Sequence, residues 1–300
     1  MKLFVLVVFA TVYAGMILGE LPLLVAVSGL LSAVFTNDVV CLAMAPVGID
    51  ACARRRLDPV PFLLALACAA NVGSAATLIG NPQNILIGQT LVLSFNGYLG
   101  YAALPTAYGL VVVWVVVALQ QRGNWGASRV APDGALDEDE EIARFDAWQT
   151  AKGLAVAAAL LVVFVATPWP REVAALGAAG VLLLSRRLHS RDKLGLVDWP
   201  LLVLFLGLFV VNGALAETGV AAAAVAALRD RGVDLAQSGW LLALTSTLAG
   251  NLVLVGSIAN LIVVDAASRH GIPITWRRHA RTGIPITLLT LLPLLLWGRS

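Results

Sequence analysis

Charge is scarce in this sequence. Asp, Glu, Lys and Arg make up 13% of the 300 residues, about half of the roughly 25% that is usual in a soluble domain. Hydrophobic residues make up 59%, and they occur in runs of helical length without alternating apolar and polar positions. This pattern excludes a water-soluble globule, disfavours an outer-membrane barrel, and predicts an all-α integral membrane protein.

Residues for redox, metal or nucleic-acid chemistry are also scarce. Cys41, Cys52 and Cys68 lie in or beside apolar stretches without CxxC spacing, so we expect no disulfide and no metal site. A net charge of +2 is too small to indicate nucleic-acid binding. The sequence has no HExxH motif, so we expect no enzyme activity and no cofactor. The histidines fall in Arg-rich loops and are expected to be solvated: His189, His270 and His279.

About nine apolar segments are present, and roughly 20 apolar residues are needed to cross a bilayer core of about 30 Å. The first half, residues 1–119, has segments at 3–18, 21–49, 60–95 and 98–119. Residues 120–150 are polar and acidic, and predict a cytoplasmic linker. The second half, residues 151–300, has segments at 154–167, 173–185, 201–215, 240–264 and 284–297.

Basic residues predict which ends of these segments face the cytoplasm, because short cytoplasmic loops carry the excess of Lys and Arg. With the turn at Arg54, Arg55 and Arg56 inside, the linker and the turn at 269–281 also fall inside. This count places the protein as a multi-pass protein of the cell inner membrane.

Two apolar runs carry the same polar interruption. The first reads NVGSAATLIGNPQNILIG at 71–88, and the second reads STLAGNLVLVGSIANLIVV at 246–264. Aligning Asn84 with Asn260 also matches Gly80 with Gly256. By the charge count the two runs cross in opposite directions, so they form an inverted repeat. Inverted repeats with broken helices are typical of secondary transporters, whose site lies near the membrane midplane.

The interruptions predict broken helices. Pro82 removes a backbone donor, and Gly80 and Gly256 permit unusual dihedral angles. Helices that restart near Ile85 and Leu261 would direct their positive N-terminal ends toward the bundle centre, where they suit an anion. Such irregular backbone survives in a membrane only against protein or water.

No Lys or Arg lies deep in any apolar run, so an anion would be held by hydrogen bonds. The expected substrate ligands are Asn81, Asn84, Ser257 and Asn260. The alternative interpretation is that each of these side chains only bonds across helices. It is weaker for a repeated pair than for a single Asn.

A third interruption, Thr36, Asn37 and Asp38, lies inside the run 21–49. Asp38 is a carboxylate in the middle of a long apolar run, where an ionisable group indicates function. We therefore expect a sodium or proton site at these three residues. The alternative is that Asp38 is the N-cap of a half-helix over 39–49. The run itself either crosses the membrane in two pieces or returns to the same side as a hairpin.

These motifs resemble the ion transporter superfamily, which includes arsenite permeases, NhaD-type sodium/proton antiporters, citrate carriers and sodium-coupled dicarboxylate carriers. The similarity rests on FTNDVVCLAMAPV, on ANVGSAATLIGNPQNILIG and on STLAGNLVLVGSIANLIVV, and is greatest to bacterial anion permeases. The resemblance implies two inverted repeats around one site, with Thr36, Asn37 and Asp38 at a hairpin tip and Asn84 and Asn260 at broken-helix turns. It also implies alternating access, often in a homodimer.

The chain is shortened relative to that pattern, with one helix before the first hairpin and no second hairpin tip between Leu228 and Trp240. The sequence thus predicts a secondary active transporter for a small anion, coupled to sodium or protons. The alternatives are a sodium/proton antiporter, an arsenite exporter, and a shortened homologue that does not transport.

Overall fold

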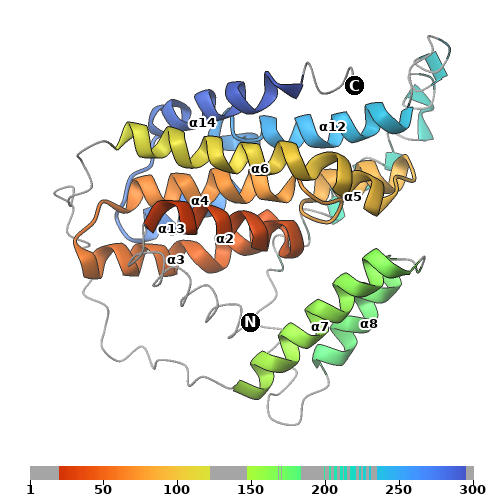
Figure 1. Ribbon diagram of the computed structural model, residues 1–300, viewed down its shortest axis with the longest axis horizontal. Coiled ribbons are helices and arrows are strands. Elements are labelled where there is room, and N and C mark those ends of the chain that lie inside the picture. The colour runs from red at the N-terminus through yellow and green to blue at the C-terminus, as the bar shows by residue number, and fades with distance from the viewer. Residues whose placement is uncertain are drawn as a thin grey trace. The chain divides into compact units, whose positions relative to one another are not determined.

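The computed structural model describes residues 20–121, 147–167, 169, 171–183, 199 and 235–294, with isolated positions between 203 and 230 (Figure 1). The predicted segments at 3–18 and 201–215 and most of the predicted linker lie outside these residues or are described only at isolated positions. All elements among the described residues are helices, as the composition predicts. The count of nine segments and the division into two inverted halves stay predictions.

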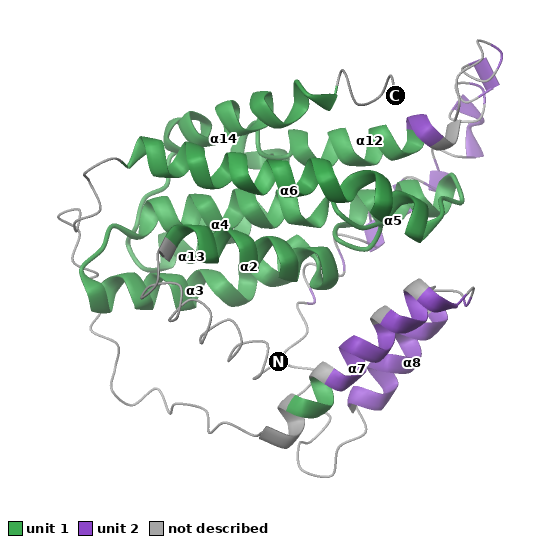
Figure 2. Ribbon diagram, in the orientation of Figure 1, with its two compact units in different colours: residues 1–154, 239–300 green, residues 155–238 purple. Residues whose placement is uncertain are grey.

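The chain divides into two compact units (Figure 2). Unit 1 comprises residues 1–154 and 239–300, and unit 2 comprises residues 155–238. Unit 2 contains most of α7 (Ala147–Ala166) and all of α8 (Arg171–Leu183). α7 begins seven residues before the predicted segment 154–167 and ends one residue before its end. α8 begins and ends two residues before the predicted segment 173–185 does. Several of their apolar side chains are exposed, as expected of helices that face lipid.

Unit 1 contains all three predicted interruptions. Its helices are α2 (Glu20–Phe35), α3 (Asn37–Arg55), α4 (Pro59–Ser74), α5 (Pro82–Thr90), α6 (Phe95–Gln120), most of α12 (Leu235–Ala249), η1 (Leu254–Gly256), α13 (Ile258–Arg269) and α14 (Trp276–Leu291). α4 is buried along all but its first residue. It contacts α2, α3, α6, α13 and α14, and lies in the middle of the bundle in Figure 1. An apolar helix of this kind forms a core because it has no polar face to present.

One helix among the described residues, α6, is long and apolar enough to cross a membrane. Its exposed apolar side chains recur at helical spacing: Leu104, Tyr108, Val111, Trp114, Val115 and Leu119. The opposite side packs against α2, α4 and α14. α6 confirms the segment predicted at 98–119 and extends it at both ends.

The run 21–49 forms two helices that pack against each other and turn at Thr36, where the sequence places the break (Figure 1). α3 continues to Arg55, six residues beyond the predicted end. Thr36 has φ 74°, a conformation that is unfavourable for a β-branched residue. Such strain persists only where the surrounding structure holds the turn in place.

Contacts at the two ends of unit 1 show how α4 and α12 enter the bundle. At one end, Arg278 on α14 forms an ion pair of 2.8 Å with Asp58, which is the N-cap of α4. At the other end, the ring of Trp240 on α12 lies 5.4 Å from that of Tyr101. Since α4 starts at the first end and α12 starts near the second, the two helices approach the centre from opposite ends.

Candidate functional site

The first break, residues 75–81, is a tight return of the chain between α4 and α5. Asn81 is the N-cap of α5 and accepts a hydrogen bond of 2.8 Å from the Asn84 N–H, while Pro82 takes the first helical position. A Cβ on Gly80 would lie 2.1 Å from the Ser74 carbonyl oxygen. Glycine is therefore required here for close approach. Its φ is not positive, so the close approach, and not a left-handed conformation, is what requires glycine at this position.

The second break, residues 250–257, is built in the same way. Ser257 is the N-cap of α13 and accepts from the Ala259 N–H at 3.2 Å. A Cβ on Gly256 would lie 2.8 Å from the Gly250 carbonyl oxygen, six residues earlier, as Gly80 lies against Ser74. Gly256 likewise has no positive φ.

The repeated asparagines occupy equivalent places. Asn84 and Asn260 are the third residues of α5 and α13. Each folds its amide back onto a carbonyl seven residues earlier, with Asn84 Nδ2 2.9 Å from Thr77 O and Asn260 Nδ2 3.4 Å from Val253 O. The internal repeat is thus present in the hydrogen bonds as well as in the amino-acid sequence. The helices start three residues before the predicted Ile85 and Leu261, because Asn81 and Ser257 act as caps.

In unit 1, the residues at each break bond to the helix that leads into the other break. Thr247, near the end of α12, accepts from Asn81 Nδ2 at 3.0 Å and donates to Asn84 Oδ1 at 2.8 Å. Asn71 on α4 donates to Asn260 Oδ1 at 2.9 Å and accepts from Ser257 Oγ at 2.7 Å. Apart from Ser257, which is partly buried, these residues are almost completely buried. The four predicted substrate ligands therefore fall into two neighbouring clusters.

The hairpin tip joins both clusters. The Asn37 N–H donates to Gly80 O at 3.0 Å, and Asn37 Nδ2 donates to Asn71 Oδ1 at 2.8 Å. The Asp38 carboxylate interacts with the backbone N–H of Ala259 in the first turn of α13. Asp38 is the second residue of α3 and Thr36 is its N-cap, so the N-cap interpretation of Asp38 is wrong.

Two buried oxygens at this tip have no hydrogen-bond partner, Asn37 Oδ1 and Asp38 Oδ1. Both are acceptors, and buried acceptors are normally satisfied. A cation or a proton donor would satisfy them. By contrast, the four predicted substrate ligands have no unbonded polar side-chain atom. Besides the bonds given above, Asn81 bonds to Ser74, Asn84 to Tyr98 and Asn260 to Gly250 O.

Sequence reasoning did not select several residues that hold this site: Asn71, Thr247 and Asn251 from the motifs, and Tyr98 and His279 from elsewhere. Tyr98 is completely buried on α6, where its hydroxyl accepts from Asn84 Nδ2 at 3.2 Å and donates to Ala75 O at 2.8 Å. His279 is 1% exposed, and its Nε2 lies 3.1 Å from Asn251 O. The expectation of a solvated His279 is wrong, because α14 carries this side chain from an Arg-rich turn into the bundle.

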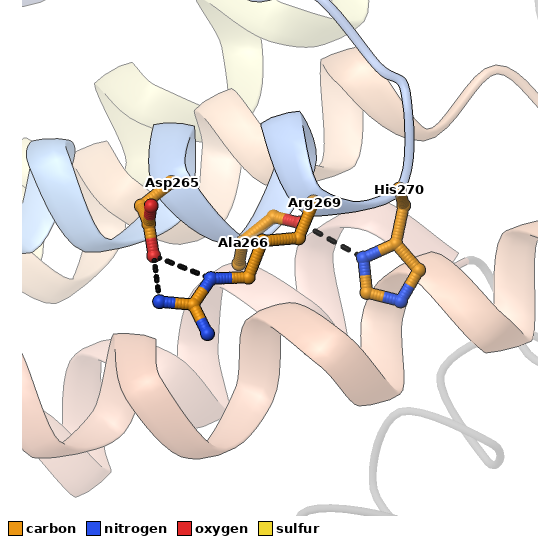
Figure 3. A network of polar contacts seen from close by, with 4 residues as sticks. All are labelled: Asp265, Ala266, Arg269 and His270. Carbon is orange, nitrogen blue, oxygen red and sulfur yellow. Dashed lines mark hydrogen bonds and ion pairs between the residues drawn. The ribbon is translucent and has the colours of Figure 1, made fainter.

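At the end of α13, His270 is exposed to solvent, as the sequence predicts (Figure 3). Its Nδ1 lies 2.8 Å from Ala266 O, and Arg269 forms an exposed ion pair of 2.8 Å with Asp265. Among the described residues, no group of three His, Cys, Asp or Glu side chains could hold a metal ion. The described cysteines are free and buried.

Comparison with known proteins gives the family. The citrate transporter family (CitMHS) matches residues 5–252 of the chain. A 46 kDa membrane protein of Mycobacterium leprae is 32% identical over 325 residues, which cover 90% of this chain and 74% of that protein. An uncharacterized transporter of Mycobacterium tuberculosis is 32% identical over 330 residues, with 92% and 76% covered.

A shorter match is to the silicon efflux transporter LSI3 of Oryza sativa subsp. japonica, which is 48% identical over 73 residues, or 24% of this chain and 15% of that protein. The names of these relatives are consistent with the ion transporter superfamily, which the motifs of the sequence resemble. The chain therefore belongs to the citrate transporter family of membrane transport proteins.

Proposed function

We propose that the protein is a secondary active transporter that moves a small anion across the inner membrane, driven by a sodium or proton gradient. The observation that carries this proposal is that one hairpin tip contacts the residues at the starts of both α5 and α13. The Asn37 N–H donates to Gly80 O, just before the N-cap of α5, and the Asp38 carboxylate interacts with the Ala259 N–H in the first turn of α13. Both helices present N-terminal ends, each equivalent to about half a positive charge.

An anion would bind by exchange at these helix starts. The Asn81 and Ser257 side chains now cap the N–H groups of Asn84 and Ala259. An anionic oxygen can take the place of a capping oxygen and gains from the helix dipole, as in other helix N-terminal anion sites. Because the ligand replaces hydrogen bonds that the protein forms without it, the net free energy of binding is small, and the ligand can be released on the other side.

The cation would bind at the hairpin tip. The unpartnered oxygens of Asn37 and Asp38 are buried, and Asp38 carries the formal charge that a coupling ion needs. α3 bears both residues in its first turn and packs against α13. Occupancy of the tip by a cation would therefore act on the start of α13, where we place the anion.

The experiment is citrate uptake into proteoliposomes under an imposed sodium or proton gradient. We expect Asn84→Ala and Asn260→Ala each to reduce uptake by about tenfold or more, because each removes the amide that bonds the break and leaves buried partners unpaired. Gln83→Ala is the matched control, since Gln83 is the exposed neighbour of Asn84 on α5. Uptake that is unchanged in both asparagine variants would show that the site is elsewhere.

A second candidate is a sodium/proton antiporter or an exporter of a neutral oxyacid such as arsenous acid. Asp38 favours it, as a buried carboxylate that can exchange a proton for sodium, and the rice relative is named for silicon efflux. Proton flux driven by sodium without added anion would identify the antiporter. Binding of citrate without flux would instead identify a homologue that does not transport.

A further inference from the structure

Asn71 makes more side-chain hydrogen bonds between elements than any predicted site residue. Its Oδ1 accepts from Asn37 Nδ2 at 2.8 Å and from Ser257 Oγ at 2.7 Å. Its Nδ2 donates to Asn251 Oδ1 at 2.8 Å and to Asn260 Oδ1 at 2.9 Å. A side-chain amide has two donor hydrogens and two acceptor lone pairs. The whole capacity of Asn71 is therefore used by other residues of the chain.

The four partners come from separate parts of the fold. Asn37 lies at the hairpin tip, Asn251 lies in the second break, and Ser257 and Asn260 lie at the start of α13. Asn71 itself lies in the last turn of α4 and is 1% exposed. One side chain thus connects the proposed cation site to one of the two proposed anion-binding helix starts.

We propose that Asn71 is a positioning residue that fixes the hairpin tip relative to the start of α13 and so couples the cation site to the anion site. This inference rests on the transport function proposed above. Asn71 is not one of the proposed substrate ligands, because it lies in the last turn of α4 and not at the start of α5 or α13. Its role is to hold Asn37, Ser257 and Asn260 in one arrangement.

Asn37 depends on this bond more than the other partners do. Asn260 keeps bonds from its Nδ2 to Gly250 O and Val253 O without Asn71. The Asn37 side chain bonds to Asn71 through Nδ2, while its Oδ1 has no partner. Loss of the Asn71 amide therefore frees the hairpin tip first.

Native cysteines provide the readout, and it does not depend on transport. Cys41 lies one turn after Asn37 on α3 and is completely buried, whereas Cys52 lies near the far end of the same helix and is 1% exposed. In single-cysteine versions, Asn71→Ala should raise the rate of N-ethylmaleimide modification of Cys41 about tenfold, the effect of losing one net hydrogen bond on a local opening equilibrium. The rate at Cys52 should not change.

One further variant sharpens the test. Asn84→Ala removes an amide of the other cluster, which has no side-chain bond to Asn71, and should leave Cys41 protected. The proposal is overturned if Asn71→Ala leaves the Cys41 rate unchanged, or if it raises the Cys41 and Cys52 rates equally.

Coupling to transport is read from citrate uptake in a double-mutant cycle. Asn71→Ala and Asn37→Ala should each raise the KM for citrate, and the double variant should raise it by less than the product of the two single effects, because both substitutions remove the bond between these residues. The effects of Asn71→Ala and Asn84→Ala on KM should instead multiply. A full product of the two effects in the first pair would contradict the positioning role. Absence of citrate uptake in the wild type would contradict the proposed function alone, because the cysteine result stands without it.

Discussion

Tyr98 shows how a single hydroxyl holds the first break. It is buried on α6 and bonds both the Asn84 amide and the Ala75 carbonyl. Ala75 follows the last residue of α4 and Asn84 lies in α5, so the hydroxyl joins the two sides of the break. A buried polar group that loses its partner costs more than the bond itself contributes.

Tyr98→Phe should therefore lower the free energy of unfolding by about 1–3 kcal/mol, because it leaves the Ala75 carbonyl and one Asn84 hydrogen unpaired. Thermal unfolding of the purified protein in detergent measures the change. Tyr108→Phe on the same helix is the control, since Tyr108 is 43% exposed and should unfold like the wild type. Equal effects of the two variants would mean that the buried hydroxyl adds nothing to the first break.

At the scale of elements, the interruptions could be predicted from the sequence because their signals are local. Gly, Pro and Asn inside an apolar run mark a break wherever the run folds, and the repeat places the two breaks in register. The sequence predicts the starts of α5 and α13 three residues too late, because Asn81 and Ser257 act as caps and a cap is recognised from its hydrogen bond.

The partners of the break residues could not be predicted in the same way. Thr247 and Asn84 are 163 residues apart, and Asn71 and Asn260 are 189 apart. The sequence around each residue does not specify which polar residue of a distant helix will be its hydrogen-bond partner. The sequence predicts a solvated His279 for the same reason: its Arg-rich neighbours indicate the turn and carry no information on how the helix that follows packs.

Packing between α2 and α4 depends on two glycines. A Cβ on Gly73 would lie 2.1 Å from the Gly29 carbonyl oxygen, and these contacting atoms belong to the backbone, which cannot move aside as a side chain could. Small residues allow membrane helices to approach this closely. The contact also holds the hairpin helix α2 against the helix that carries Asn71.

Gly73→Ala should force α2 and α4 apart and lower the midpoint of thermal unfolding by several degrees, as overpacking typically costs about 1–3 kcal/mol. Gly100→Ala on α6 is the matched control, because nothing lies within 4 Å of the added Cβ and alanine favours a helix. If Gly73→Ala were as stable as Gly100→Ala, the helices would not be in this close contact.

At the scale of the whole molecule, the described basic turns lie together at one end of unit 1. Arg278 pairs with Asp58, next to the turn at Arg56, and Gln120 at the end of α6 donates to Arg281 O at 2.8 Å. The turn around Val92 lies beyond the other end of α4, close to the start of α12, where Gly239 packs on Leu91. The charge count predicts that the first end faces the cytoplasm.

Cysteine labelling from each side of the membrane tests this orientation. Arg56→Cys, Arg277→Cys and Val92→Cys change exposed residues, each in a chain whose three native cysteines are replaced by alanine. An impermeant maleimide should modify the first two only in inside-out vesicles and the third only in right-side-out vesicles, because α4 and α5 together separate the Arg56 and Val92 turns. Labelling of Arg56→Cys and Val92→Cys from the same side would mean that this broken helix does not cross the bilayer. The two breaks would then not lie at its midplane, and the site we propose would be open to one compartment only.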